Sequence, residues 1–318
     1  MKSLTRRIFV KRTSLAALAT VVPNSPLGFP HLAAQTSVPN VHFSKEPRER
    51  IAVASYPFRE FIIGRHDAKS SAAKMPLKDF PAHVITKFNV RKIEPWSEHF
   101  ASLEPAYLDE LRNAATNAGS SFADIAADGE NSIYSPDSAE RQRAMQFSKH
   151  WIDVAARLGS PSLRTHIAGF KNAKPDVTRA TESLKPIADY AASRNVVVHL
   201  ENDDPVSEDP FFIASLLDSV NSPWLRALPD FGNSFAALPA DEAFRGVDQM
   251  FARAFAISHV KDAISDAANK VIPVDIAKVF ALAAKHNYKG VLSMEFDTQG
   301  DPYQGTTRLI AATLKNLS

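Results

Sequence analysis

Four short apolar stretches in the last third of the chain decide the fold: Val196-Val-Val-His-Leu-Glu201, Leu225-Arg-Ala-Leu-Pro-Asp230, Ala256-Ile-Ser-His259 and Val291-Leu-Ser-Met-Glu295. Each stretch has the length, the apolar content and the abrupt polar end of a buried parallel strand. The polar end residues lie 29, 29 and 36 residues apart, close to one strand–helix unit each. If the strands belong to one barrel, the four polar side chains meet at its carboxyl-terminal end.

The polar residues at these strand ends have the chemistry of metal ligands. Glu201, Asp230, His259 and Glu295 together offer carboxylate oxygens and an imidazole nitrogen, which suit Mn²⁺, Mg²⁺, Co²⁺ or Zn²⁺. Buried carboxylates repel one another unless a cation neutralises them. Each residue alone has an ordinary structural explanation as a helix cap, an ion pair or a core histidine. Their occurrence in four successive units favours a metal site.

The chain from about residue 50 alternates strand-like and helix-like segments, which is typical of a parallel α/β fold. Strands are predicted over residues 51–56, 90–94, 121–126 and 162–166, followed by the four stretches above. Helices are predicted over residues 77–88, 106–118, 139–158, 180–194, 210–219, 241–251, 275–286 and 306–316. Eight units of about 31 residues predict a single-domain (β/α)₈ TIM barrel.

The main competing architecture is an open doubly wound sheet. Such a sheet normally carries a glycine-rich phosphate turn after its first strand. The chain has only 11 glycines and no G-x-G-x-x-G pattern, so this architecture and nucleotide binding are both disfavoured.

The first 34 residues resemble a twin-arginine (Tat) export signal. Thr5-Arg6-Arg7-Ile8-Phe9-Val10-Lys11 precedes a short Ala-rich apolar segment that ends at Pro23, and small residues at 32–34 offer a cleavage site. The apolar segment is too short to span a bilayer, so no stable membrane insertion is expected. We therefore expect a signal over residues 1–34, a linker over 35–49, the barrel over 50–318, and export to the periplasm by the Tat translocase.

Charge and cysteine content narrow the classes of partner. Removal of residues 1–34 leaves 32 basic and 35 acidic residues, a formal charge of −3. A nucleic-acid partner is disfavoured because phosphate binding needs a concentrated positive face. The chain contains no cysteine, which excludes disulfides, thiolate metal sites and a cysteine nucleophile.

Residues 50–318 resemble the xylose isomerase-like TIM-barrel superfamily, in particular its sugar phosphate isomerase/epimerase branch. The motifs that carry the resemblance are His199-Leu-Glu201-Asn202, Pro229-Asp230-Phe-Gly-Asn233, Ser258-His259-Val-Lys261-Asp262 and Ser293-Met-Glu295-Phe. The segments Ala54-Ser-Tyr-Pro-Phe58 and Lys92-Ile-Glu-Pro-Trp96 are also similar to the family. The order and spacing of these motifs are specific for the fold and the metal site, and not for a substrate.

The resemblance implies one divalent metal, with manganese preferred, held by Glu201, Asp230, His259 and Glu295. It also implies that Glu201 and Glu295 exchange the protons of a sugar through an enediolate. Return of the proton from the opposite face would invert a carbon, whereas transfer between adjacent carbons would isomerise an aldose and a ketose. Superfamily members are often dimers or tetramers, so a homo-oligomer is expected.

The chain departs from the family pattern at Asn233, three residues after Asp230. Ketose epimerases and zinc-dependent AP endonucleases of the superfamily usually carry His at that place. The departure argues against the substrate contacts of the ketose 3-epimerases. It also argues against a trinuclear zinc nuclease, which needs a further His and Asp beyond His259.

Further side chains at or just beyond strand ends are candidate substrate contacts: Glu94, Trp96, His99, Arg164, His166, Asn233 and Lys261. Trp96 would either stack on a sugar face or pack in the barrel. Arg164 and His166 share a strand face, and they would grip a substrate oxygen or bond to neighbouring strand ends. Lys261 points the same way as His259 by strand alternation and would contact a substrate oxygen or form an ion pair.

The function expected from these features is metal-dependent isomerisation or epimerisation of an unphosphorylated sugar or keto-sugar. The usual phosphate site of such barrels uses glycine-rich turns after strands 7 and 8, and only Gly300 and Gly305 occur there. The same base and metal would also serve a lyase or dehydratase acting on 3-keto-glycosides or inososes. A non-catalytic periplasmic carbohydrate-binding protein is the alternative from another class, because a fold does not by itself imply a function.

Overall fold

The computed structural model describes residues 38–64, 74–171 and 173–317, which form one compact unit. The segment expected to be the export signal, residues 1–34, lies outside this part of the chain. None of the described helices is long and apolar enough to cross a membrane.

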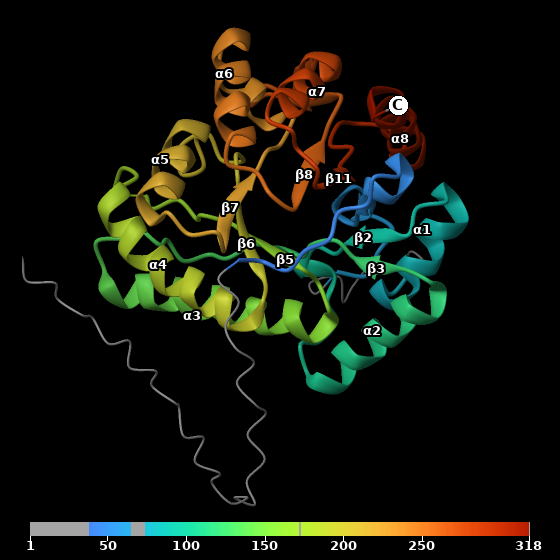
Figure 1. The fold of residues 1–318 in the computed structure, drawn as a ribbon, viewed down its shortest axis with the longest axis horizontal. Coiled ribbons are helices and arrows are strands. Elements are labelled where there is room, and N and C mark those ends of the chain that lie inside the picture. Colours follow the sequence, from blue (N-terminus) through green and yellow to red (C-terminus); the bar gives the residue numbers. More distant parts are fainter. Residues whose placement is uncertain (1–37, 65–73, 172, 318) are drawn as a thin grey trace, which may run out of the picture. The chain divides into compact units, whose positions relative to one another are not determined.

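Parallel strands form a closed barrel in two arcs (Figure 1). One arc has the order β3-β2-β1-β11-β8, and the other has the order β4-β5-β6-β7. The bounds are β1 Ile51–Ala54, β2 Lys92–Glu94, β3 Ser121–Phe122, β4 Ala126–Ala127, β5 Ser162–Thr165, β6 Val197–Glu201, β7 Leu225–Leu228, β8 Ile257–Val260 and β11 Val291–Met294. Isolated parallel bridges, Trp96 to Ala126 and Asp230 to His259, join the arcs. The predicted (β/α)₈ barrel is therefore confirmed.

Helices surround the barrel, one after each barrel strand when β3 and β4 are taken as two parts of one strand (Figure 1). Their bounds are α1 Phe80–Phe88, α2 Pro105–Ala118, α3 Ser138–Leu158, α4 Val177–Arg194, α5 Pro210–Val220, α6 Ala240–Phe251, α7 Ile276–Lys285 and α8 Pro302–Leu317. Aspartates at 137, 176, 209 and 275 begin four of them by accepting backbone N–H bonds. Gly119, Gly159, Asn195 and Asn221 end four of them in the left-handed conformation.

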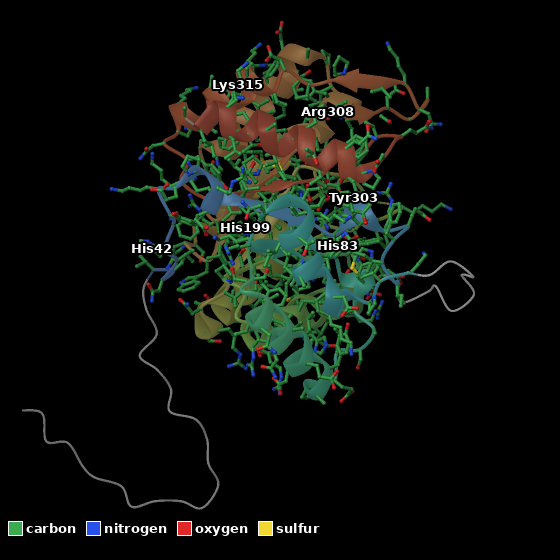
Figure 2. The ribbon with its side chains drawn as sticks, turned by 90° about the vertical axis from the view of Figure 1, so that its right-hand side faces the viewer. His42, His83, His199, Tyr303, Arg308 and Lys315 are labelled. Atoms are coloured by element: carbon green, nitrogen blue, oxygen red, sulfur yellow. The ribbon has the colours of Figure 1, made fainter. Side chains whose placement is uncertain are left out.

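The core lies between the strands and the inner faces of the helices. In α4, Ala180, Leu184, Ile187, Ala188 and Ala191 are at most 1% exposed and recur with the helical period. The last helix closes the ring against the first, where His83 of α1 lies 3.1 Å from the Tyr303 hydroxyl of α8 (Figure 2).

The third barrel strand differs from its prediction because Asp124 interrupts it between β3 and β4. The buried Asp124 carboxylate accepts the backbone N–H of Arg164 at 2.9 Å and the hydroxyl of Ser162. The Arg164 N–H also donates to the Ile125 carbonyl at 2.9 Å, so the side-chain contacts of Asp124 lie beside a continuing backbone pairing. The carboxylate also lies 3.4 Å from His199, which is fully buried inside the barrel.

Two features were not predicted from the sequence. A short antiparallel hairpin, β9 Ala263–Ser265 and β10 Val271–Pro273, follows β8, and the Asp266 side chain accepts two backbone N–H bonds in its turn. Residues 38–50 also pack on the barrel, where Arg50 donates to the carbonyls of Tyr288 and Gly290.

Candidate active site

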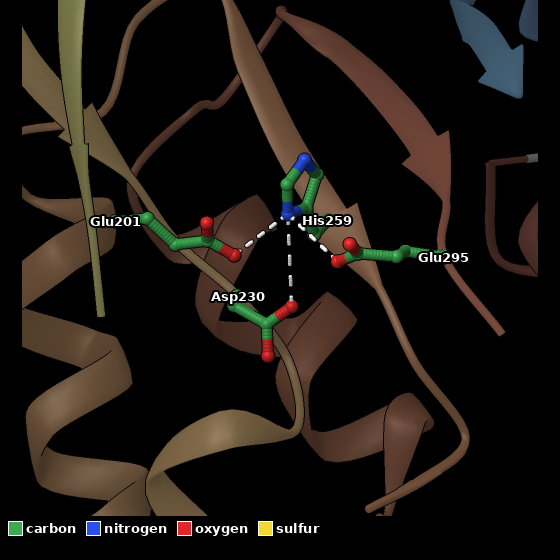
Figure 3. A group of neighbouring side chains, drawn as sticks. All are labelled: Glu201, Asp230, His259 and Glu295. Atoms are coloured by element: carbon green, nitrogen blue, oxygen red, sulfur yellow. Dashed lines mark hydrogen bonds and ion pairs between the residues drawn. The ribbon is translucent and has the colours of Figure 1, made fainter. Parts of the chain in front are cut away.

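Glu201, Asp230, His259 and Glu295 converge at the carboxyl-terminal end of the barrel (Figure 3). Glu201 is the last residue of β6, and His259 lies in β8. Glu295 directly follows β11, and Asp230 stands two residues beyond the end of β7. One ligand-type atom from each residue lies within 4.8 Å of the others. His259 Nδ1 is 2.7 Å from Glu201 Oε1, 2.9 Å from Glu295 Oε2 and 3.9 Å from Asp230 Oδ2.

Two oxygens of this cluster are buried and accept no hydrogen bond from the described residues: Asp230 Oδ2 and Glu295 Oε2. The other oxygen of Asp230 accepts the backbone N–H groups of Gly232 and Asn233 at 2.7 and 2.6 Å. Those two bonds aim the free oxygen of Asp230 at the cluster. Buried oxygen acceptors without donors, together with an imidazole nitrogen, are the donor set that a divalent cation takes. The four residues therefore fit a metal ion.

Glu94 orients the imidazole of this cluster. Its Oε1 lies 2.8 Å from His259 Nε2, and its side chain is 1% exposed. Metal-binding histidines usually donate their second ring nitrogen to such a carboxylate, which fixes the ring and the tautomer. Glu94 does not line the cavity described below, so its contact is with His259.

Burial and mutual repulsion dominate the electrostatics of the cluster. Burial, with Glu201 and Glu295 nearby, raises the pKa of Asp230 to about 7 although Lys261 opposes the shift. Burial would also raise the pKa of Glu295, but His259 and Lys261 outweigh it and hold that pKa below its usual value. Burial raises the pKa of Glu201 in spite of its cationic neighbours. The cluster thus concentrates negative charge that a cation would neutralise.

Lys261 is a buried cation at the side of this cluster. Its ammonium donates to Asn233 Oδ1 at 2.7 Å and lies 3.3 Å from Glu295 Oε2 and 3.4 Å from Asp230 Oδ2. A further carboxylate, Asp297, is 3.6 Å away. Burial would lower the pKa of Lys261, but these carboxylates raise it well above the usual value, so the lysine is charged.

Arg164 binds three carboxylates of the site. Its Nε donates to Glu201 Oε2 at 2.7 Å, its Nη2 to Asp203 Oδ2 at 2.8 Å, and its Nη1 to Asp128. The Trp96 indole N–H donates to the second Asp128 oxygen at 2.6 Å. The arginine is therefore held by the protein from several sides.

A small polar cavity of about 130 Å³, open to solvent, lies above these residues. The predicted residues that line it are Trp96, Arg164, Glu201, Asn233, His259, Lys261 and Glu295. Tyr56, Asp128, Asp203 and Asp297 also line it and were missed from the sequence. Asp203 and Asp297 stand two residues after Glu201 and Glu295, so strand alternation was a signal that would have found them.

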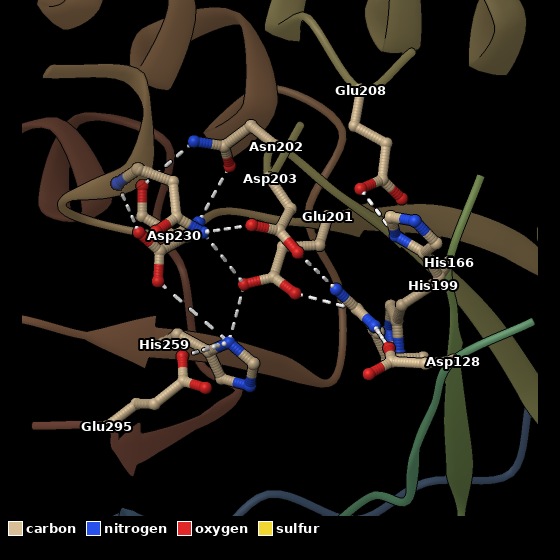
Figure 4. Close-up of polar contacts among 12 residues, drawn as sticks. Asp128, His166, His199, Glu201, Asn202, Asp203, Glu208, Asp230, His259 and Glu295 are labelled. Carbon is tan, nitrogen blue, oxygen red and sulfur yellow. Dashed lines mark hydrogen bonds and ion pairs between the residues drawn. The ribbon is translucent and has the colours of Figure 1, made fainter. Parts of the chain in front are cut away.

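Two predicted contacts lie beside the cavity and do not line it. The Nδ1 atom of His99 lies 2.8 Å from the Ser55 hydroxyl. The Nδ1 atom of His166 lies 2.8 Å from Glu208 Oε2 (Figure 4). Glu208 also accepts the backbone N–H of Ile167 at 2.7 Å, so this pair fastens the loop after β6 to β5.

Comparison with known proteins identifies the family. The family model described as Xylose isomerase-like TIM barrel matches residues 85–316, and the chain belongs to that family. A search among curated proteins finds no match.

Solved structures share the fold at low sequence identity. A xylose isomerase-like TIM barrel protein from Mycobacterium smegmatis in complex with magnesium is 17% identical, with a TM-score of 0.62 over 84% of this chain and 96% of that chain. The D-allulose 3-epimerase from Methylomonas sp. with D-allulose is 15% identical, with a TM-score of 0.65 over 88% and 100%. The 3-keto-D-glucoside 4-epimerase from E. coli is 12% identical, with a TM-score of 0.62 over 84% and 99%.

Proposed function

We propose that this protein is a divalent-metal-dependent isomerase or epimerase of unphosphorylated sugars or keto-sugars that works through an enediolate. The observation that carries the proposal is the convergence of Glu201, Asp230, His259 and Glu295, where two buried oxygens accept no hydrogen bond from the described residues. Two proteins of the same fold are described as sugar epimerases and one as a magnesium complex, which supports the reaction class and the use of a metal.

The four side chains would hold one divalent ion, with manganese the preferred candidate and magnesium, cobalt or zinc the alternatives. When bound, that ion would stabilise negative charge on the substrate oxygens beside the reacting carbon. Glu201 and Glu295 both line the cavity, and a carboxylate can remove a proton made acidic by an adjacent carbonyl. Lys261, at the wall of the cavity, can donate to a substrate oxygen.

The lining of the cavity supports a neutral polyhydroxy substrate. Asp128, Asp203 and Asp297 form an acidic rim, with side chains 40%, 43% and 22% exposed. Carboxylates accept hydrogen bonds from sugar hydroxyls and repel phosphate groups. Trp96 and Tyr56, whose rings are 5.1 Å apart, offer apolar surface for a sugar face.

We further propose that the protein acts in the periplasm after export by the Tat translocase. The order of the arginine pair, the apolar segment and the small residues within positions 1–34 supports this location.

Metal binding and proton exchange test the proposal together. The protein is stripped with a chelator, titrated with Mn²⁺ by calorimetry, and then incubated with keto-sugars in D₂O. We expect one ion per chain and metal-dependent deuterium uptake in the wild type, with both lost in Asp230→Ala. Asp241→Ala, a change of the same type at an exposed residue of α6, is the matched control. Stoichiometric sugar binding without metal or exchange would instead show a binding protein.

A further inference from the structure

The two glutamates of the site are held very differently. Glu201 has both oxygens engaged: Oε1 lies 2.7 Å from His259 Nδ1, and Oε2 accepts from Arg164 Nε at 2.7 Å. Glu295 has only Oε2 near charged nitrogens, with His259 Nδ1 at 2.9 Å and Lys261 Nζ at 3.3 Å. Both of these contacts are ion pairs of Oε2, none of the hydrogen bonds or ion pairs among the described residues involves Oε1, and the residue lines the cavity.

Arg164 cannot readily move away from Glu201. The arginine is 4% exposed, and two more of its nitrogens bind Asp128 and Asp203. Trp96 in turn fixes Asp128 through its indole N–H at 2.6 Å. Buried charge-assisted bonds of this kind hold both partners in one geometry. Arg164 is therefore a positioning residue for Glu201.

A carboxylate needs a free oxygen to take a proton from carbon. A proton placed on Glu201 Oε2 would lie against the Arg164 Nε–H, and Oε1 faces His259. Glu295 Oε1 meets no such obstacle. We propose that Glu295 alone transfers the substrate proton, while Glu201 is a fixed ligand held by Arg164, so that the enzyme works with one base. This inference rests on the function proposed above.

One base restricts the reactions that the site can perform. Glu295 removes the proton beside a carbonyl, the electron pair of the C–H bond forms the enediolate double bond, and the carbonyl oxygen takes the charge. When the proton on Glu295 has exchanged with solvent and is delivered to the neighbouring carbon on the same face, while the hydroxyl proton of the first carbon moves to the former carbonyl oxygen, aldose–ketose isomerisation results and the product carries the solvent label. Alternatively, the C–O bond at the β-carbon breaks, Glu295 gives its proton to the leaving oxygen, and an unsaturated ketone forms. Inversion of a carbon would need a donor on the other face.

The stereochemistry of deuterium uptake distinguishes one base from two. Wild-type protein saturated with Mn²⁺ is incubated in D₂O with D-fructose, D-allulose or methyl 3-keto-β-D-glucoside, and label position and configuration are read by NMR. We expect deuterium to enter with retention, with no interconversion of D-fructose and D-allulose and no epimer of the keto-glucoside. Formation of any epimer labelled at the inverted carbon would overturn the inference and leave the proposed function intact. No exchange from any probe would overturn both.

Variants of the two glutamates test the assignment independently. Glu295→Gln should lower the exchange rate by about 10²- to 10⁴-fold, the usual contribution of a general base, with the metal still bound. Glu201→Gln, assayed at saturating Mn²⁺ with the metal content measured, should lower the rate by less than this general-base contribution, because only a ligand is weakened. Equal losses in both metal-loaded variants would contradict the inference. Arg253→Met, which breaks contacts with Asp218 and Gln249 and none with the residues of the site, is the control.

Discussion

Replacement of Arg164 by methionine should destabilise the protein far more than an ordinary ion-pair loss. Methionine keeps much of the length of the side chain and removes its charge and donors. Asp128 and Asp203 are 40% and 43% exposed, so water can replace their lost bonds. Glu201 is 3% exposed and would keep a buried charge without its arginine. The cost therefore concentrates on Glu201, and we expect a loss of about 3–5 kcal/mol in the free energy of unfolding.

Arg253→Met supplies the matched comparison for this prediction. Arg253 also binds a carboxylate at two points, with Asp218 oxygens at 2.8 and 2.6 Å, but Asp218 is 62% exposed. The expected loss is below about 1 kcal/mol. Urea denaturation at pH 7 with chelator measures the free energy of unfolding of both variants. Saturating Mn²⁺ should reduce the loss of that free energy only for Arg164→Met. Equal small losses in the two variants would refute the reasoning that the Arg164 contact with Glu201 is a buried ion pair.

Three further predictions concern other parts of the structure. Burial would lower the pKa of His166, but Glu208 outweighs burial and raises that pKa above its usual 6.5. The ion pair of His166 with Glu208 therefore stabilises the folded protein fully below about pH 6.5, and this stabilisation is lost as the pH rises through the higher pKa of the folded state. Urea denaturation should show that the difference in free energy of unfolding between wild type and His166→Gln is smaller at pH 9 than at pH 6. An equal difference at the two pH values would contradict this prediction. Glu94→Gln should weaken Mn²⁺ binding by about 10- to 100-fold in calorimetry, because His259 loses its carboxylate partner, and unaltered affinity would argue against that role. Asp137→Ala should cost about 1 kcal/mol in thermal or urea unfolding by removing the cap of α3, and no loss would show that the cap contributes nothing.

The barrel was predictable because its signals are local. Each strand is a short apolar run, each helix an amphipathic stretch, and the spacing of about 31 residues fixes the number of units. The same logic placed Glu201, Asp230, His259 and Glu295 at one end of the barrel. The structure brings these four together, since parallel strands bring their carboxyl ends to one edge.

The environment of each site residue was not predictable in the same way. Glu201 and Glu295 look equivalent in the sequence, because each ends an apolar strand. Their difference arises from Arg164, 37 positions before Glu201, and from Lys261, whose contacts depend on side-chain packing across the barrel. Glu94 was expected to contact substrate, and its contact with His259 spans 165 positions. Contacts between residues so far apart in the sequence leave no local pattern from which they could be predicted.

The central claim is that this barrel end transfers a proton from a sugar with the help of a divalent metal. Deuterium uptake from D₂O into a keto-sugar panel, measured on one preparation before chelation, after chelation and after reloading with Mn²⁺, tests it most directly. We predict uptake that disappears on chelation, returns with about one equivalent of Mn²⁺ and is absent in Glu295→Gln at the same metal content. Uptake that persists without metal, or that Glu295→Gln retains in full, would contradict the account.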